Sequence, residues 1–242
     1  MRRYYYDLHT HSCLSPCGSA ESTPASIAGM AKLSGLDIIA LTDHNSSKNC
    51  PAFFEAARAY GIVPVAGMEL TTSEDIHAVC LFEDLEDALR FDEWVDGRRM
   101  KIPNRPDIFG EQQILDSDDN EIGRVDTLLT VATDISIDDL TDHVKEYGGV
   151  CYPAHIDRDA NGIIAVLGTI PPDTSFTWYE IHDDNRIDEF AERYGIAKDR
   201  FITSSDAHYL DGIQDKRNYL LLDCDSDDEN EVRRALFELL RR

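Results

Sequence analysis

The sequence lacks any long apolar run, and no stretch approaches the roughly 18 consecutive apolar residues of a membrane-spanning helix. Its first residues include Arg2 and Arg3, but no apolar segment of the length that a signal peptide needs follows them. These absences argue against a membrane protein and against a secreted one. We therefore expect a soluble, cytoplasmic chain with no membrane partner.

The chain also has little positive charge. It carries 23 lysine and arginine residues against 47 aspartate and glutamate residues, which gives a formal net charge of -24. A field of this sign repels phosphate polymers, which argues against non-specific binding of nucleic acid. It still permits a small phosphorylated substrate, because bound divalent cations reverse the sign of the charge locally.

Paired cysteines are absent as well. The 6 cysteines are scattered without a CxxC pair, and a chain of 242 residues can bury a sizeable core without disulfides. We expect most of these cysteines to be buried thiols. The length suits one large domain over residues 1–242, because α/β barrels commonly reach about 200–250 residues as one unit.

What the sequence does contain is a regular alternation of strand-like apolar runs and helical patterns, with the last strands expected near residues 176–182, 200–208 and 218–223. The first helix is expected to begin after Thr23, which can cap it, with Pro24 in its first turn and Gly35 at its end. Such alternation indicates an α/β fold with a parallel sheet, open or closed into a barrel. The polar residues 96–134 fit no such unit, and we interpret them as an insertion on the rim that holds a hairpin.

Metal-binding residue types gather at the ends of the expected strands. Residues two apart on a strand share a face and lie about 6.6 Å apart, so His9 and His11 can converge on one metal ion. Carboxyl ends of parallel strands meet at one edge, and Glu69 and Asp206 add carboxylates there. Imidazole with carboxylate suits zinc, manganese or iron. The histidines within or at the ends of these strands are His9, His11, His44, His77, His155 and His208.

These motifs, taken in order, resemble those of the PHP family, the polymerase and histidinol phosphatase domains. The resemblance rests on DLHTHS (7–12), TDH (42–44), GMEL (67–70), IHAV (76–79), PAH (153–155) and SDAH (205–208). It runs from Tyr4 to His208 and implies a distorted (β/α)7 barrel with two or three divalent metal ions. It also implies that the chain hydrolyses a phosphate ester.

The resemblance suggests a role for each residue. One metal would be held by His9, His11, Glu69 and Asp206. Glu69 would bridge to a second metal, held also by His77 and His155, and a third would use His44 and His208. A carboxylate such as Glu69 can bridge two cations, whereas a neutral imidazole cannot. We expect both Glu69 and Asp206 to take part in catalysis.

The third metal site departs from the family pattern. Where the family often has a further histidine or aspartate, this chain has Pro16, Cys17 and Gly18. Cys17 either supplies a thiolate, which would favour zinc or iron, or is a nearby free thiol, and we expect the second.

Several other residues are candidates for roles around the metals. Asp7 and Asp43 are expected to orient histidines rather than bind metal, because metal-bound imidazoles usually donate their other N–H to an acceptor. Arg158 is placed to bind a substrate phosphate through two parallel hydrogen bonds. Lys48 and His182 are weaker candidates, whereas His143 lies in a helical pattern and is expected at the surface.

The function expected from these residues is metal-dependent hydrolysis of a phosphate ester by a metal-activated water at a centre of two or three metals. The substrate would be a small phosphorylated metabolite or a nucleotide. One alternative is a 5'-3' exonuclease on short oligonucleotides, which would need a local basic groove. The other is a metal-binding PHP module without catalytic activity.

Replacement of Cys17 separates the two interpretations of the third metal site. If Cys17 makes no bond to the metal, Cys17→Ser leaves the number of metals per chain unchanged in elemental analysis, and this is the result we expect. Loss of one metal, with the sites around Glu69 still filled, would show instead that Cys17 is a ligand, and that the site is sensitive to oxidation.

Overall fold

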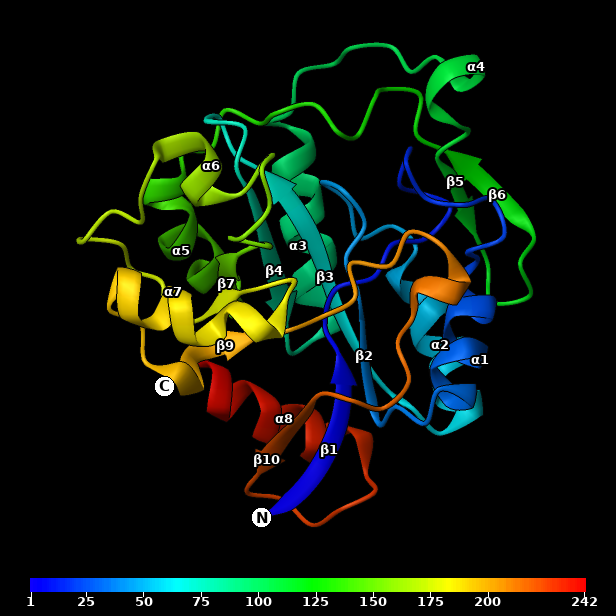
Figure 1. Cartoon of the computed structure of the whole chain (residues 1–242). Helices are drawn as coiled ribbons and strands as arrows, with labels where there is room; N and C mark the ends of the chain where they lie inside the picture. The colour runs from blue at the N-terminus through cyan, green and yellow to red at the C-terminus, as the bar shows by residue number, and fades with distance from the viewer.

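The structure is a computed structural model that describes residues Met1–Arg242. Its centre is a curled six-stranded sheet whose strands follow the order β10-β1-β2-β3-β4-β7 (Figure 1). The strands β1, β2 and β3 are parallel, as the alternation of strands and helices predicts. The strands of the sheet are β1 (Arg2–Asp7), β2 (Ile38–Leu41), β3 (Val63–Thr71), β4 (His77–Phe82), β7 (Val150–Pro153) and β10 (Tyr219–Leu222).

The prediction of a wholly parallel sheet is wrong for β4 and β10. β4 runs antiparallel to both β3 and β7, and β10 runs antiparallel to β1. The physical reason for β4 is its connection, because only residues 72–76 separate it from β3 and a parallel crossover needs a dozen residues or more.

A closed seven-stranded barrel is not confirmed either. The segments expected as strands near residues 176–182 and 200–208 form only β8 (Tyr179–Glu180) and β9 (Phe201–Ile202), a separate parallel pair. Ile181 N still donates to Ile202 O at 2.9 Å, but after Ile181 side chains replace the neighbouring strand as partners of the backbone. The N–H groups of His182 and Asp183 donate to the Asp157 carboxylate at 2.8 and 2.9 Å. The sheet is therefore a curled half-barrel.

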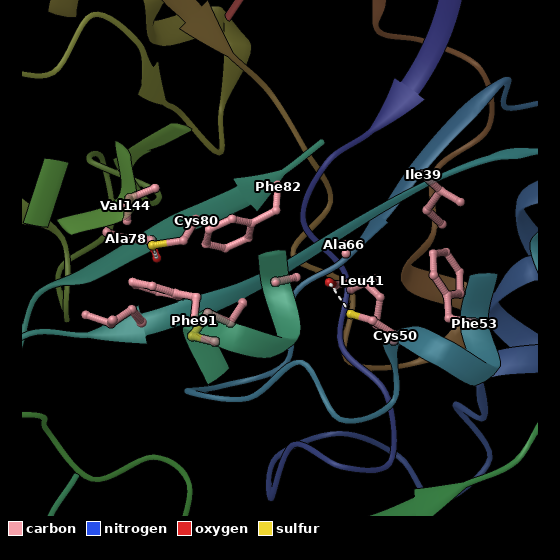
Figure 2. Packing of buried hydrophobic residues seen from close by; sticks show 14 of the residues in the cluster. Ile39, Leu41, Cys50, Phe53, Ala66, Ala78, Cys80, Phe82, Phe91 and Val144 are labelled. Atoms are coloured by element: carbon pink, nitrogen blue, oxygen red, sulfur yellow. Dashed lines mark hydrogen bonds between the residues drawn. The ribbon is translucent and has the colours of Figure 1, made fainter. Parts of the chain in front are cut away.

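Two apolar clusters cover the two faces of this sheet. Along β2, Ile39 and Leu41 belong to the cluster beneath α1, α2, α3 and α5 (Figure 2). Ile38 and Ala40 belong to the cluster that α8 closes. All four side chains are fully buried. A strand covered on both faces has no polar side, which explains its continuous apolar sequence.

The helices begin and end where local signals place them. The Thr23 side chain accepts a hydrogen bond from Ser26 N, and Pro24 opens α1, as predicted. Gly61 ends α2 in the left-handed conformation, with φ of 68°. The α-helices are α1 (Pro24–Leu33), α2 (Cys50–Tyr60), α3 (Leu85–Asp96), α4 (Pro106–Phe109), α5 (Ile137–Glu146), α6 (Ile163–Leu167), α7 (Ile187–Tyr194) and α8 (Glu229–Leu240), with 3-10 turns at Asp184–Arg186, Lys198–Arg200 and Leu210–Gly212. None of these helices has the length and apolar character needed to span a membrane.

The segment between α3 and α5 lies outside the sheet and contains α4 and a hairpin of β5 (Gln113–Leu115) and β6 (Glu121–Arg124). It is tied to the loop after β2 by Asn45, whose side-chain amide donates to Leu129 O at 2.6 Å and to Val131 O at 3.0 Å. The insertion therefore stands on the edge of the sheet where β2 ends (Figure 1).

Gly67 is where β3 comes closest to its neighbours. A Cβ atom at this position would lie 2.5 Å from Cys80 O, 2.9 Å from Leu81 Cδ2 and 3.1 Å from Thr42 Cγ2. We expect Gly67→Ala to lower the free energy of unfolding by about 1–3 kcal/mol, as overpacking of a core does. Urea denaturation measures this change. Gly97→Ala is the control, because its Cβ would meet nothing nearer than 3.4 Å; equal stability of the two variants would contradict the prediction.

Candidate metal centre

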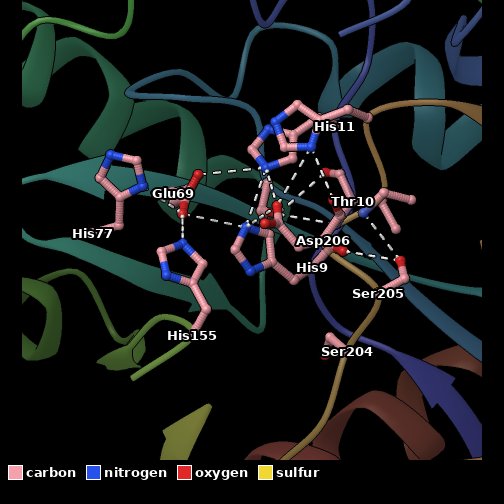
Figure 3. A network of polar contacts seen from close by, with 12 residues as sticks. His9, Thr10, His11, Glu69, His77, His155, Ser204, Ser205 and Asp206 are labelled. Carbon is pink, nitrogen blue, oxygen red and sulfur yellow. Dashed lines mark hydrogen bonds and ion pairs between the residues drawn. The ribbon is translucent and has the colours of Figure 1, made fainter. Parts of the chain in front are cut away.

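The predicted metal ligands meet at the edge of the sheet where the parallel strands end (Figure 3). His9 and His11 follow β1, His44 follows β2, and Glu69 lies near the end of β3. His77 is the first residue of β4, which reaches the same edge because β4 is antiparallel. The remaining ligands, His155, Asp206 and His208, follow β7 and β9.

Two of these ligands lie on strained backbone. His155 has a φ of 31° and Asp206 a φ of 51°, in the left-handed region that residues other than glycine rarely adopt. Each costs on the order of 1–3 kcal/mol and persists only where the surrounding structure holds it. Here the strain turns an imidazole and a carboxylate toward the centre of the site.

Glu69 is the centre of this arrangement. Its Oε1 lies 2.8 Å from His77 Nδ1 and 3.0 Å from His155 Nε2. Its Oε2 lies 3.0 Å from His44 Nδ1 and 3.4 Å from His11 Nε2. The carboxylate is almost completely buried, so its two oxygens face separate groups of histidines, as a bridging ligand requires.

A tighter group forms on one side of Glu69. The Nε2 atoms of His9 and His11 are 3.1 Å apart, and Asp206 Oδ1 lies 3.3 Å from the first and 3.1 Å from the second. His9 Nε2 is also 3.5 Å from Glu69 Oε1. Four ligand atoms bound at about 2.0–2.1 Å to one tetrahedral zinc would lie about 3.3–3.4 Å from one another. The observed spacing fits a shared cation.

The tautomer of His9 follows from Glu180. Both oxygens of this buried carboxylate lie within reach of His9 Nδ1, at 2.9 and 3.1 Å, and Glu180 Oε2 also accepts from His155 N at 3.0 Å. An ionised carboxylate only accepts, so His9 Nδ1 carries the proton. In neutral His9, Nε2 therefore presents a lone pair to the centre of the site.

The tautomer of His11 follows from Ser15 by elimination. The Ser15 hydroxyl donates its only hydrogen to Asp43 Oδ1 at 2.7 Å and accepts from His44 N at 3.1 Å. It also lies 3.0 Å from His11 Nδ1, which must then be the donor of that contact. In neutral His11, Nε2 likewise presents a lone pair.

With both imidazoles neutral, two lone pairs thus converge with the Glu69 and Asp206 carboxylates. Two further atoms support a cation: His44 Nδ1 and Glu69 Oε2 are buried and 3.0 Å apart, yet neither has a hydrogen-bond partner. Buried polar atoms are normally paired. Imidazoles and carboxylates are ligands that suit zinc, manganese or iron. The residues present therefore fit the divalent metals that the sequence implies.

The pKa values of His9 and Glu69 also show that this site favours positive charge. Burial by itself lowers the pKa of His9, but the charges of Glu180, Asp206 and Glu69 raise it well above its usual value. Burial raises the pKa of Glu69, whereas His77, His44 and His9 lower it well below its usual range. Without a cation, a proton on His9 supplies part of the missing charge.

Potential ligand atoms fall into three groups whose members lie within 4.8 Å of one another. The first group, formed by His9, His11, Glu69 and Asp206, contains the four residues predicted to hold the first metal. In the second group His44 joins Glu69 and His77, whereas His155 reaches only Glu69 Oε1. Cys17 is exposed and belongs to none of the groups. The groups are His9, His11, Glu69 and Asp206; His44, Glu69 and His77; and His11, His44 and His208.

The expected supporting aspartates act less directly than predicted. Asp43 reaches His11 only through Ser15. Asp7 accepts from the backbone N–H groups of His9 at 3.4 Å and Ser205 at 3.0 Å, and so holds the chain rather than an imidazole. Glu180 and Ser15 are the residues that the sequence analysis missed as orienting groups. A carboxylate at the end of the expected strand 176–182 was the signal for Glu180.

Arg158 is the basic residue of the site. Its Nη1 contacts Asp206 Oδ2 at 2.5 Å, and its Nη2 lies 3.4 Å from His182 Nδ1. It lines a cavity of about 350 Å³ together with His44, Glu69, His77, His155, Asp206 and His208. Lys48 pairs with Asp92 outside this cavity, and His143 packs on Trp94 at the surface.

Glu180→Gln tests the orientation of His9. An amide N–H facing Nδ1 would favour the tautomer with its proton on Nε2, which removes the lone pair from the metal site. We expect about 10–100-fold weaker binding of one metal, the typical effect of losing such a partner, with an unchanged circular dichroism spectrum. Competition with a chelator measures the affinity. Glu238→Gln, on the exposed face of α8, is the control; equal affinity of the two variants would contradict this role.

Comparison with known proteins agrees with the motifs. Residues 7–94 match the family model of the PHP domain. An error-prone DNA polymerase of Nocardia farcinica is 42% identical over 67 residues, which are 28% of this chain but only 6% of the polymerase. This chain therefore matches a small part of that protein.

Two solved structures have a similar fold. One is a lesion-specific endonuclease, endonuclease Q of Pyrococcus furiosus, with a TM-score of 0.64 and 18% identity over 98% of this chain and 56% of that one. The other is a putative metal-dependent phosphoesterase of Bifidobacterium adolescentis, with a TM-score of 0.54 and 19% identity over 96% of this chain and 95% of that one. Residues 7–94, which include His9, His11, His44, Glu69 and His77, are therefore similar to the PHP domain, and in the structure these side chains converge with Asp206 and His208.

Proposed function

We propose that this chain is a metal-dependent phosphoesterase that hydrolyses a small phosphorylated metabolite or a nucleotide. The observation that carries the proposal is the convergence of His9 Nε2, His11 Nε2, Asp206 Oδ1 and the Glu69 carboxylate at distances that suit a shared cation. Support comes from the match of residues 7–94 to the PHP domain and from the similar fold of a putative metal-dependent phosphoesterase.

Some residues of the site would hold metals, and others would orient those ligands or bind the substrate. The first metal would be held by His9, His11, Glu69 and Asp206, and further cations on the other side of Glu69 by His44, His77, His155 and His208. Bound divalent cations activate a water and neutralise the charge that develops on the phosphoryl oxygens. Glu180 and Ser15 keep the two imidazoles in the binding tautomer.

Arg158 is suited to orient the phosphate. Its contact with Asp206 Oδ2 fixes Nη1 beside the metal ligands, while 39% of its side chain remains exposed in the cavity. A guanidinium presents five donors, so those not used by Asp206 are free to bind phosphoryl oxygens. Arg158 thus ties the position of the substrate to a metal ligand.

The cavity and its charges favour a small substrate over a nucleic-acid strand. Its volume of about 350 Å³ is at the low end of small-molecule sites. A strand needs unpaired cations along its backbone, but the exposed basic residues of the nearby insertion are each paired with an acid. The pairs are Arg98 with Asp134, Lys101 with Asp96, Arg105 with Asp107, and Arg124 with Glu111 and Glu121.

Glu69→Gln is expected to abolish hydrolysis and to leave the fold intact, because it removes the bridging charge and almost no volume. The assay is a panel of phosphomonoesters, nucleotides and short oligonucleotides with added zinc, manganese or iron. Wild type should lose activity on chelation and recover it with metal, and Glu55→Gln, on the exposed face of α2, should behave as wild type. Full turnover by Glu69→Gln would remove Glu69 from the mechanism, and inactivity of wild type on the whole panel would refute the proposed function.

A further inference from the structure

Two cysteines lie side by side on neighbouring strands of the sheet, outside the metal site. Cys80 on β4 and Cys151 on β7 are directly opposite residues of an antiparallel pair. Directly opposite residues point to the same face of a sheet. Cys80 belongs to the apolar cluster beneath α3 and α5, and Cys151 packs against that same cluster. The two thiols therefore point to one side.

The alternation of hydrogen-bonded and non-hydrogen-bonded pairs along β4 and β7 places Cys80 and Cys151 especially close together. Ala154 N donates to His77 O at 3.0 Å, which makes His77 and Ala154 a hydrogen-bonded pair. The bonding alternates along an antiparallel ladder, so Cys80 and Cys151, three positions further along, form a non-hydrogen-bonded pair. Such pairs have Cα atoms about 4.5 Å apart, with the side chains closer than in the other kind of pair.

This spacing permits a disulfide. Disulfides join Cα atoms about 4.4–6.8 Å apart, so the two strands need not separate or slide to form one. A separation near the short end of that range strains the bond, and strained disulfides are reduced easily. No other cysteine of the chain is paired with a cysteine in a strand register.

The two thiols differ in their access to solvent. Cys80 is fully buried, and Figure 2 shows it among Ala78, Phe82 and Val144. Cys151 is partly exposed and lines a cavity of about 430 Å³ between α5 and the end of α8. Burial, followed by the Cys151 thiol, raises the pKa of Cys80 well above its usual value. A soluble oxidant therefore meets Cys151 first.

We propose that Cys80 and Cys151 form an oxidation site that peroxide converts reversibly into an intramolecular disulfide. Cys151, as a thiolate, attacks one oxygen of hydrogen peroxide, breaks the O–O bond and becomes a sulfenic acid, while the other oxygen leaves as water after taking a proton. The Cys80 sulfur then attacks the Cys151 sulfur, and a second water leaves. Two thiols and one peroxide thus give one disulfide and two waters.

The crosslink would join the two strands that supply His77 and His155. Cys80 lies three residues after His77, and Cys151 lies four residues before His155. Because the opposed geometry already suits a disulfide, the crosslink braces these strands without moving the ligands. This inference is independent of the proposed hydrolytic activity.

The test uses the full-length chain treated with hydrogen peroxide, alkylated at its remaining free thiols, digested without reductant and analysed by mass spectrometry. We expect a peptide that links Cys80 to Cys151 and disappears after dithiothreitol. The oxidised chain should keep its circular dichroism spectrum and unfold at a higher temperature than the reduced one. Cys151→Ser should abolish the linked peptide, whereas Cys224→Ser, also a change at a partly exposed cysteine, should retain it.

Either of two results would overturn the proposal. The first is alkylated, unoxidised Cys80 in chains whose Cys17, Cys151 and Cys224 have reacted with peroxide. The second is a Cys80 to Cys151 link that forms only in urea-unfolded chains. Cys80→Ser is not needed for the test, so the result does not depend on a substitution in the core.

Discussion

The structure depends on one electrostatic constraint at the Glu69 carboxylate, which is buried among histidines instead of being exposed to water. Its oxygens contact five imidazoles at distances of 2.8–3.5 Å. Glu180 and Ser15 fix two of those imidazoles so that their lone pairs, and not their protons, point inward. Buried carboxylates are costly unless positive charge compensates them, and divalent cations held by these residues would supply that charge. Metal binding and folding are coupled in such a site.

The fold meets this constraint through the direction of its strands. β1, β2 and β3 deliver His9, His11, His44 and Glu69 at their carboxyl ends. β4 delivers His77 at its amino end, because the short connection after β3 turns it back. Left-handed backbone at His155 and Asp206 completes the ring of candidate ligands. A regular parallel barrel would present a ligand only after each strand, so the irregularities of the sheet serve the site.

Much of this could be predicted from the sequence. The start of α1 after Thr23 follows from local capping, which depends on a few neighbouring residues. The ligand set followed from histidines and carboxylates at strand ends and from the family motifs. The direction of β4 was missed because period-two apolar patterns do not encode strand direction. Ser15 was missed as the residue that orients His11 because its role depends on Asp43, 28 residues away in the sequence.

The most direct test of the account is X-ray diffraction from crystals of the metal-supplemented chain, measured at the absorption edges of zinc, manganese and iron. The account predicts one anomalous peak enclosed by His9 Nε2, His11 Nε2 and Asp206 Oδ1, and at least one more across Glu69. The neighbouring Nδ1 atoms of His9 and His11 should still contact Glu180 and Ser15. Crystals with no peak at this position, and with Glu69 turned away from the histidines, would contradict the central claim that the site is built to hold cations.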